Sequence, residues 1–218
     1  MIWLPNCPWT TEEISVPETR RRPARERILA AATELFYERG IAATGIDTVV
    51  AHAGVARKSL YNNFSSKDDL IAAFIEQRHH QWLDLYHDRL RDAGPTPADR
   101  VLAVFDAYTD HAEADGQRFR GCGLLNSAAE FPAGSPPRVQ VSRHKQEVED
   151  LLLAALKPGP LTKDTEDAAG VTAGHLSFLL EGAMTRSGLD GTTEHLRRAR
   201  DLAEEIVRRA TTGTPGAV

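Results

Sequence analysis

The chain is built around residues 42–74, which read AATGIDTVVAHAGVARKSLYNNFSSKDDLIAAF. Four apolar residues in the first part of this stretch recur at helical spacing on one face: Ile46, Val49, Val50 and Ala53. Gly54 predicts the end of that helix, because glycine takes the left-handed turn of a helix terminus without a Cβ clash. A second short helix follows, with Leu60 and Phe64 turned inward at i and i+4. This order predicts a helix-turn-helix, whose second helix fits the DNA major groove.

The outer face of the second helix carries hydrogen-bond donors and cations that suit DNA. Its residues are Arg57, Lys58, Ser59, Tyr61, Asn62 and Asn63. Cationic side chains suit guanine edges and asparagine suits adenine, whereas phosphate contacts set affinity and register. We expect Arg57, Lys58 and Ser59 to approach base edges. We expect Asn62 and Asn63 to reach bases or the nearby backbone.

A longer set of residues resembles the DNA-binding head of the TetR family of transcriptional regulators. The set starts with RILAAATELFYERG at residues 27–40 and continues through Thr44, residues 53–55, residues 59–64 and residues 67–70. Two positions depart from the family pattern. Ala56 stands where the family usually has Ser or Thr, which removes a side-chain N-cap worth about 1 kcal/mol. Lys58 stands where the family usually has a small residue or proline.

The resemblance also indicates where the phosphates of DNA lie. It implies that Lys67 and the free amides at the start of the next helix contact a phosphate. Thr44 and Tyr61 are the other two expected phosphate contacts. Ser66 is suitably placed to cap those amides, and Asp68 and Asp69 suit the first turn of that helix.

Beyond this stretch the sequence predicts helices only. Helical patterns extend over residues 23–39, 67–93, 99–114, 124–131, 139–156, 164–187 and 194–210, and no segment alternates with a period of two. We expect an all-α chain with a disordered arm over residues 1–22. The arm is followed by an N-terminal three-helix helix-turn-helix DNA-binding head over residues 23–70. A helical ligand-sensing and dimerisation body then covers residues 71–212. The basic end of the arm suits either a DNA backbone or a solvated tail.

The net charge of −5 for 218 residues is unevenly distributed. Residues 20–78 contain 10 Lys and Arg against 7 Asp and Glu, whereas residues 79–218 contain 16 against 21. A basic head on an acidic body would orient the protein on phosphate. The longest apolar run is far shorter than the roughly 18 residues of a membrane span, and residues 1–9 lack the pattern of a signal peptide. Cys7 and Cys122 have no metal-ligand spacing, so we expect a cytoplasmic protein without disulfides.

The last two predicted helices are candidates for a dimer interface. The first has small residues inside an apolar helix, and a glycine there costs roughly 1 kcal/mol against alanine, which suggests that another backbone approaches closely. Two such helices can form a four-helix bundle across a two-fold axis, where TetR-like proteins dimerise. The alternative is ordinary packing within one chain. The candidate interface residues are Gly170, Ala173, Gly174, Ser177, Leu196, Ala199, Leu202 and Ile206.

Aromatic residues on the body helices are few enough to share one cavity. They are Trp82, Tyr86, Phe105, Tyr108 and Phe119. An apolar pocket of this kind would sense a small-molecule effector, and a filled core fits the same residues equally well. The sequence does not identify the ligand, and we expect no cofactor.

Two rival interpretations concern histidine and cysteine. His79, His80 and His87 share one helix without the i, i+4 spacing of a metal site, so we expect no metal. Cys122, with Arg118 and Arg120 nearby, suits either an all-α thiol enzyme or a redox sensor, with His111 or His144 as a helper. The alternative is a buried, inert cysteine.

These patterns together favour a non-enzymatic DNA-binding regulator. We expect a homodimeric, ligand-released repressor that binds double-stranded DNA at a near-palindromic operator and makes no membrane contact. The rival is the thiol enzyme or redox sensor that uses Cys122.

Overall fold

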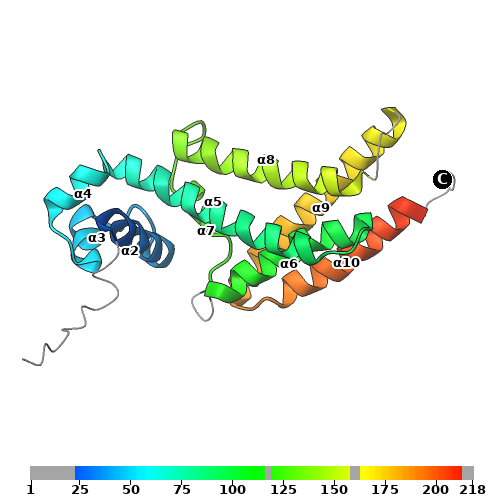
Figure 1. Cartoon of the computed structure of the whole chain (residues 1–218), viewed down its shortest axis with the longest axis horizontal. Coiled ribbons are helices and arrows are strands. Elements are labelled where there is room, and N and C mark those ends of the chain that lie inside the picture. The colour runs from blue at the N-terminus through cyan, green and yellow to red at the C-terminus, as the bar shows by residue number, and fades with distance from the viewer. Residues whose placement is uncertain (1–22, 116–118, 158–162, 213–218) are drawn as a thin grey trace, which may run out of the picture.

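The computed structural model describes residues 23–115, 119–157 and 163–212, and the predicted arm over residues 1–22 lies outside them. Within these ranges the chain forms helices and no strand, which confirms the all-α prediction. The helices are α2 (Ala24–Arg39), α3 (Ile46–Ala53), α4 (Arg57–Asn63), α5 (Lys67–Asp92), α6 (Pro97–Asp115), α7 (Gly123–Ala129), α8 (Pro136–Leu156), α9 (Lys163–Asp190) and α10 (Glu194–Thr212). Helices α2, α3 and α4 form a head at one end, and α5 leads from it into the body (Figure 1).

The ends of the head helices follow from local chemistry. Helix α2 ends at Gly40, whose φ of 87° is open to glycine and strained for other residues. Helix α3 ends at Gly54 with φ 61° and ψ 40°, the left-handed conformation predicted from the sequence. The Ser66 hydroxyl accepts a hydrogen bond from the Asp69 amide at 3.1 Å, so the predicted cap of α5 is confirmed. Ala56 precedes α4 without a side-chain cap, as its methyl group requires.

The hydrophobic core of the head reaches into the body elements. Leu60 and Phe64, the two residues predicted to turn inward from α4, are buried with the apolar faces of α2 and early α5. The same cluster includes Leu124 and Ala128 of α7 and Val141 of α8. The head is therefore attached to the body by a shared core as well as by the continuous helix α5.

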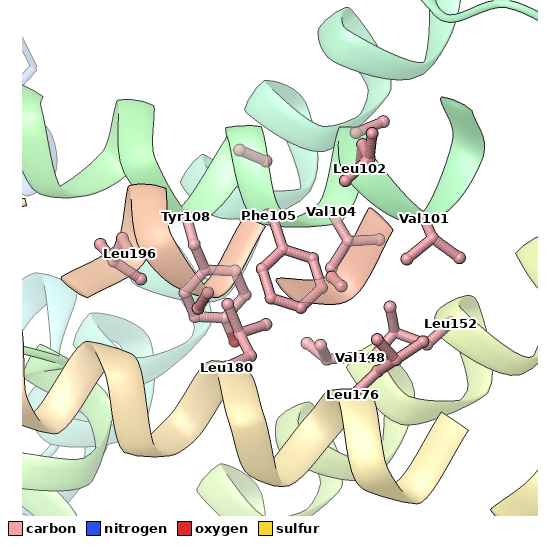
Figure 2. Packing of buried hydrophobic residues seen from close by; sticks show 14 of the residues in the cluster. Val101, Leu102, Val104, Phe105, Tyr108, Val148, Leu152, Leu176, Leu180 and Leu196 are labelled. Atoms are coloured by element: carbon pink, nitrogen blue, oxygen red, sulfur yellow. The ribbon is translucent and has the colours of Figure 1, made fainter. Parts of the chain in front are cut away.

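Helix α6 lies at the centre of the body core and packs against α5, α8 and α10. Its residues Phe105 and Tyr108 point toward Leu180 of α9, with residues of α8 and α10 beside them (Figure 2). Helices α9 and α10 pack against each other, and α10 also packs against α6. This arrangement leaves one face of α9 and α10 without cover from the rest of the described chain.

Several helix boundaries differ from the sequence predictions, and three of them have a local cause. Helix α6 begins at Pro97, before the expected residue 99, because Thr96 and Asp99 cap it reciprocally. Helix α8 begins at Pro136, since proline is well accommodated in a first helical turn. Helix α9 continues through Gly188 to Asp190, and Gly191, with φ 66°, follows it.

Candidate nucleic-acid interface

The turn between α3 and α4 is fixed from both sides. Within the turn, the amide of Val55 donates to the carbonyl of Val50 at 3.3 Å, so the chain leaves α3 in a tight reversal. From α2, the Arg27 guanidinium donates to the carbonyl of Gly54 at 3.3 Å. These contacts set the angle between α3 and α4, which is the geometry a helix-turn-helix needs to place its second helix in the major groove.

The outer face of α4 is exposed and cationic. Tyr61 has 46% of its surface exposed, and Lys58 and Asn62 are also exposed. The Arg57 guanidinium lies 5.9 Å from the centre of the Tyr61 ring and 3.0 Å from an Asp47 carboxylate oxygen on α3. The hydroxyl of Tyr61 and then the charge of Asp47 raise the pKa of Arg57, so this side chain stays cationic. A row of exposed donors on a short helix therefore faces away from the core.

Asp47 is a component of this surface that sequence reasoning missed. It lies on the first turn of α3, and it pairs with Arg57 across the turn, where no helical repeat relates the two positions. The pair is exposed, with 60% of the Arg57 side chain and 78% of the Asp47 side chain accessible. Asp47 therefore directs the Arg57 side chain while leaving it open to a ligand.

The geometry corrects the predicted Thr44 contact and shows how the Asn63 side chain is held. Thr44 is 1% exposed and donates its hydroxyl proton to the Gly40 carbonyl at 2.7 Å, so its side chain stabilises the chain connection and does not face a phosphate. The Asn63 amide donates to the Ser59 carbonyl at 2.7 Å, one turn back on the same helix. One of the two protons of the Asn63 amide is therefore used within α4.

Lys67 lies at the first position of α5, where the helix amides are free. Its ammonium is half-buried and donates to the Ile41 carbonyl at 2.7 Å, which leaves two further protons for another acceptor. The positive end of the α5 dipole lies beside it. Lys67 and the start of α5 therefore retain the chemistry expected of a phosphate contact.

The five aromatic residues predicted to line a ligand pocket are buried in the body core. They are Trp82, Tyr86, Phe105, Tyr108 and Phe119, and each is at most 5% exposed. Trp82 stacks on Tyr86 with ring centroids 5.6 Å apart and lies 5.2 Å from Tyr108. None of them lines the groove between α9 and α10, the cleft between α5 and α8, or the hollow beside Cys122. In this part of the chain the filled-core alternative fits their positions.

A polar cluster that no sequence pattern predicted lies beside these aromatics. The Lys145 ammonium lies 2.7 Å from Glu181 and donates to the Tyr108 hydroxyl at 3.2 Å. Burial alone would lower the pKa of Lys145, but Cys122, Tyr108 and Glu181 together raise it well above its usual value. Cys122 itself is half-buried. The body therefore contains a buried Lys145 ammonium whose charge is balanced by Glu181.

His144, one of the two histidines predicted to assist Cys122, belongs to a second cluster. Its Nδ1 lies 2.5 Å from Nδ1 of His79, whose Nε2 lies 3.2 Å from Glu147. Burial, followed by Lys145, His79 and His111, lowers the pKa of His144 to about 2, so the ring stays neutral. Among the described residues no three potential ligands converge on a metal position. Together with α5 and α8, these side chains line a cleft of about 420 Å³.

The exposed face of α9 and α10 is apolar and partly formed by glycine. Phe178 is 74% exposed, Val171 60% and Leu202 42%. A Cβ atom placed on Gly170 or Gly174 would meet nothing within 4 Å, so these glycines open onto free space. A groove of about 720 Å³ runs between the two helices beside Phe178 and Leu202. We call Val171, Phe178 and Leu202 with the two glycines the α9–α10 face.

Several residues predicted for the dimer interface point the other way. Ala173, Ser177 and Leu196 are at most 9% exposed, because they pack toward the core of their own chain. Ala199 is 2% exposed and lines the groove between α9 and α10. Ile206 is half-buried against the same core. Gly170, Gly174 and Leu202 remain on the α9–α10 face, whereas Val171 and Phe178 were missed. Apolar residues surround α9 on several sides, so periodicity does not select its outer face.

The fold and the α4 surface together define the chain as a helix-turn-helix DNA-binding protein with a helical body. A family model described as "Bacterial regulatory proteins, tetR family" matches residues 28–74, and one described as "Tetracyclin repressor-like, C-terminal domain" matches residues 97–203. SCO4454, a TetR-family transcriptional regulator from Streptomyces coelicolor, has a similar crystal structure with 31% identity and a TM-score of 0.74. That match covers 87% of this chain and 96% of SCO4454. The chain therefore belongs to the TetR family of transcriptional regulators.

Characterised relatives include proteins with opposite effects on transcription. The transcriptional activator FasR from Mycolicibacterium smegmatis is 38% identical over 103 residues, and the match covers 46% of this chain and 45% of FasR. The transcriptional repressor DhaR from Mycobacterium sp. strain GP1 is 24% identical over 181 residues, covering 81% of this chain and 88% of DhaR. This chain thus spans less than half of the first relative and most of the second.

Proposed function

We propose that this TetR-family regulator is a homodimeric repressor that binds a near-palindromic DNA operator and is released by a small molecule. The observation that carries the proposal is the exposed outer face of α4, where Arg57, Lys58, Tyr61 and Asn62 are accessible. Such side chains combine base readout with phosphate attraction. The longer alignment with the repressor DhaR, compared with the shorter one with the activator FasR, favours repression.

Within this proposal the DNA contacts have two roles. Arg57 and Lys58 read base edges, with Ser59 and Asn62 beside them. Tyr61 and Lys67 contact phosphates, together with the amides at the start of α5. The buried position of Thr44 removes its side chain from the set, whereas Asn63 keeps a second amide proton for bases or the nearby backbone.

The homodimer is proposed to form through the α9–α10 face. Burial of an exposed aromatic ring such as Phe178 contributes at roughly 25 cal/mol per Å² of apolar surface. The open glycines allow a second backbone to approach closely, as in helix bundles. Two-fold symmetry then presents two copies of α4 to the same side, so half-sites lie about 34 Å apart or somewhat further.

A small-molecule effector is proposed to act by changing the separation of the two heads. The cleft between α5 and α8 is one candidate site, because α5 carries the head and its residues line the cleft. A ligand that favours the non-binding spacing about 100-fold supplies about 2.7 kcal/mol of coupling per site. Operator DNA must then weaken ligand binding by the same factor.

We further propose that the protein acts in the cytoplasm and is not an enzyme. The thiol-enzyme alternative needs a base beside Cys122, and the neutral, low-pKa His144 is already engaged with His79. No helix in the described part of the chain is long and apolar enough to cross a membrane.

In vitro selection from random duplexes, followed by anisotropy titrations at several salt concentrations, tests the proposal. We expect a recovered site whose affinity falls steeply with salt, since each phosphate contact contributes about −0.9 to the log–log slope. Failure to recover any preferred duplex would count against a sequence-specific regulator.

A further inference from the structure

The connection between α2 and α3, residues 40–45, is held by a carboxylate from the body. Glu130, immediately after α7, accepts a hydrogen bond from the Ile41 amide at 2.8 Å through Oε1. Its Oε2 accepts from the Ala42 amide at 2.6 Å. Both oxygens are therefore used on two consecutive amides, which is a charge-assisted arrangement stronger than neutral pairs.

Gly40 creates the concavity that receives this carboxylate. Its φ of 87° turns the following amides to one side, and a Cβ atom at Gly40 would lie 3.1 Å from Oε1 of Glu130. The connection is held on its other side by α5, because the Lys67 ammonium donates to the Ile41 carbonyl at 2.7 Å. Its exit toward α3 is therefore fixed between the body and the start of α5.

A second body residue holds the end of α2. Arg120 donates to the Tyr37 carbonyl at 3.2 Å and to the Glu38 carbonyl, which are among the last carbonyls of the helix. The Arg120 amide donates to the Tyr37 hydroxyl at 2.7 Å. A cation at a helix C-terminus is also favoured by the helix dipole.

The segment that carries Arg120 rests on the helix of the proposed dimer face. A Cβ atom at Gly188 of α9 would lie 2.5 Å from the Cα atom of Gly121, so the two backbones are in close contact. Helix α7, which precedes Glu130, packs against α2 as well. Contacts thus run from α9 through residues 120–130 to the α2–α3 connection, in addition to the continuous path along α5.

We propose that Glu130 and Arg120 are positioning residues for DNA binding, an inference that rests on the proposed function. From the body they fix the α2–α3 connection, and through it the start of α3 and the direction of α4. Neither side chain touches DNA in this arrangement. Their removal loosens the head relative to the dimer axis while the phosphate and base contacts themselves remain intact.

Glu130→Gln is the sharpest test, because it keeps the shape and removes the charge and one of the two acceptors. Glu130 is exposed, so the variant is expected to fold. Against a duplex selected by the wild-type protein, we expect about tenfold weaker binding with an unchanged salt slope, since no phosphate contact is lost. In the free protein, hydrogen exchange at the Ile41 and Ala42 amides should rise at least about tenfold while core amides keep their protection.

Glu113→Gln is the matched control. Glu113 is also an exposed carboxylate of the body, and it pairs at 2.7 Å with Arg197 on α10. We expect it to bind the same duplex as wild type does. Arg120→Ala is the second variant, expected to weaken binding about threefold to tenfold with Glu130 in place.

The outcomes separate this inference from the proposed function. Wild-type binding with unchanged affinity in Glu130→Gln would overturn the positioning role alone. Equal loss in Glu113→Gln and Glu130→Gln would also overturn it, because the effect would then be a general one of body charge. If the wild-type protein selects no duplex, the proposed function fails first and this inference fails with it.

Discussion

Helices α4 and α9 both leave one face uncovered, and the two faces differ in chemistry. On α4 the uncovered side chains are cationic and polar, with Leu60 turned inward to the core of the head. On α9 they are apolar, with Phe178 74% exposed and glycines open beside it. Water forms hydrogen bonds with the side chains of the first face and not with those of the second. A polar exposed face suits a hydrated, charged ligand such as DNA, whereas an apolar one is stable only when another apolar surface covers it.

The largest expected effect comes from charging the α9–α10 face. Phe178→Glu places a carboxylate where the second copy is proposed to pack, so we expect a monomer at micromolar concentration in sedimentation. Loss of the second head removes the gain of simultaneous binding, and operator affinity should fall at least about 100-fold. Val139→Glu, at an exposed apolar position on α8, is the control and should remain dimeric. A dimeric Phe178→Glu protein would assign the second copy to another surface.

The next effect is on the α4 face. Arg57→Ala should weaken binding to the preferred duplex about tenfold to 100-fold, with relaxed preference at particular base pairs. Arg91→Ala is the control, because Arg91 is an exposed arginine of α5 that pairs with Asp88 at 2.7 Å. Titrations against single-base variants of the selected duplex measure the change. Uniform weakening on every duplex would make Arg57 a phosphate contact and reverse our orientation of α4.

Lys67→Ala should have a smaller effect that does not depend on sequence. Removal of one phosphate contact flattens the log–log salt slope by about one unit and weakens all duplexes alike. Anisotropy titrations between about 50 and 200 mM salt measure it. A change in base preference without a change in the salt slope would contradict the proposed phosphate contact of Lys67.

The smallest expected effect belongs to Asp47. Asp47→Asn removes the ion-pair partner of Arg57 and leaves Arg57 itself in place. Exposed ion pairs contribute little to stability. We expect affinity within about threefold of wild type and a modest loss of discrimination at the base pairs that Arg57 reads. A double-mutant cycle with Arg57→Ala checks the coupling. Independent, additive effects would show that Asp47 does not direct Arg57.

The difference between α4 and α9 also explains how far the sequence could be read. Local signals were reliable in the head, where Gly54 ends α3, Ser66 caps α5, and Leu60 and Phe64 turn inward. Each of these depends on residues a few positions apart. The outer face of α9 was predicted only in part, because small and apolar residues lie on both the buried side and the exposed side of this helix.

Two further contacts that the sequence analysis missed join distant parts of the chain. Glu130 binds amides 89 and 88 residues away, and no periodicity points to it. Lys145 likewise contacts Tyr108 and Glu181 from a third helix, and no periodicity points to it.

Thr44 and Asn63 carry residue types that suit DNA, yet each donates to a nearby backbone carbonyl. Residue type alone does not separate these two uses of one hydrogen-bond donor.

The stoichiometry and symmetry of the DNA complex test the central claim most directly. The claim is that α4 meets DNA while the α9–α10 face meets a second copy. Native mass spectrometry of the wild-type protein on its selected duplex should show an even number of chains, with two as the simplest case. The selected sequence should have dyad symmetry. One chain per duplex, on a site without dyad symmetry, would contradict the account.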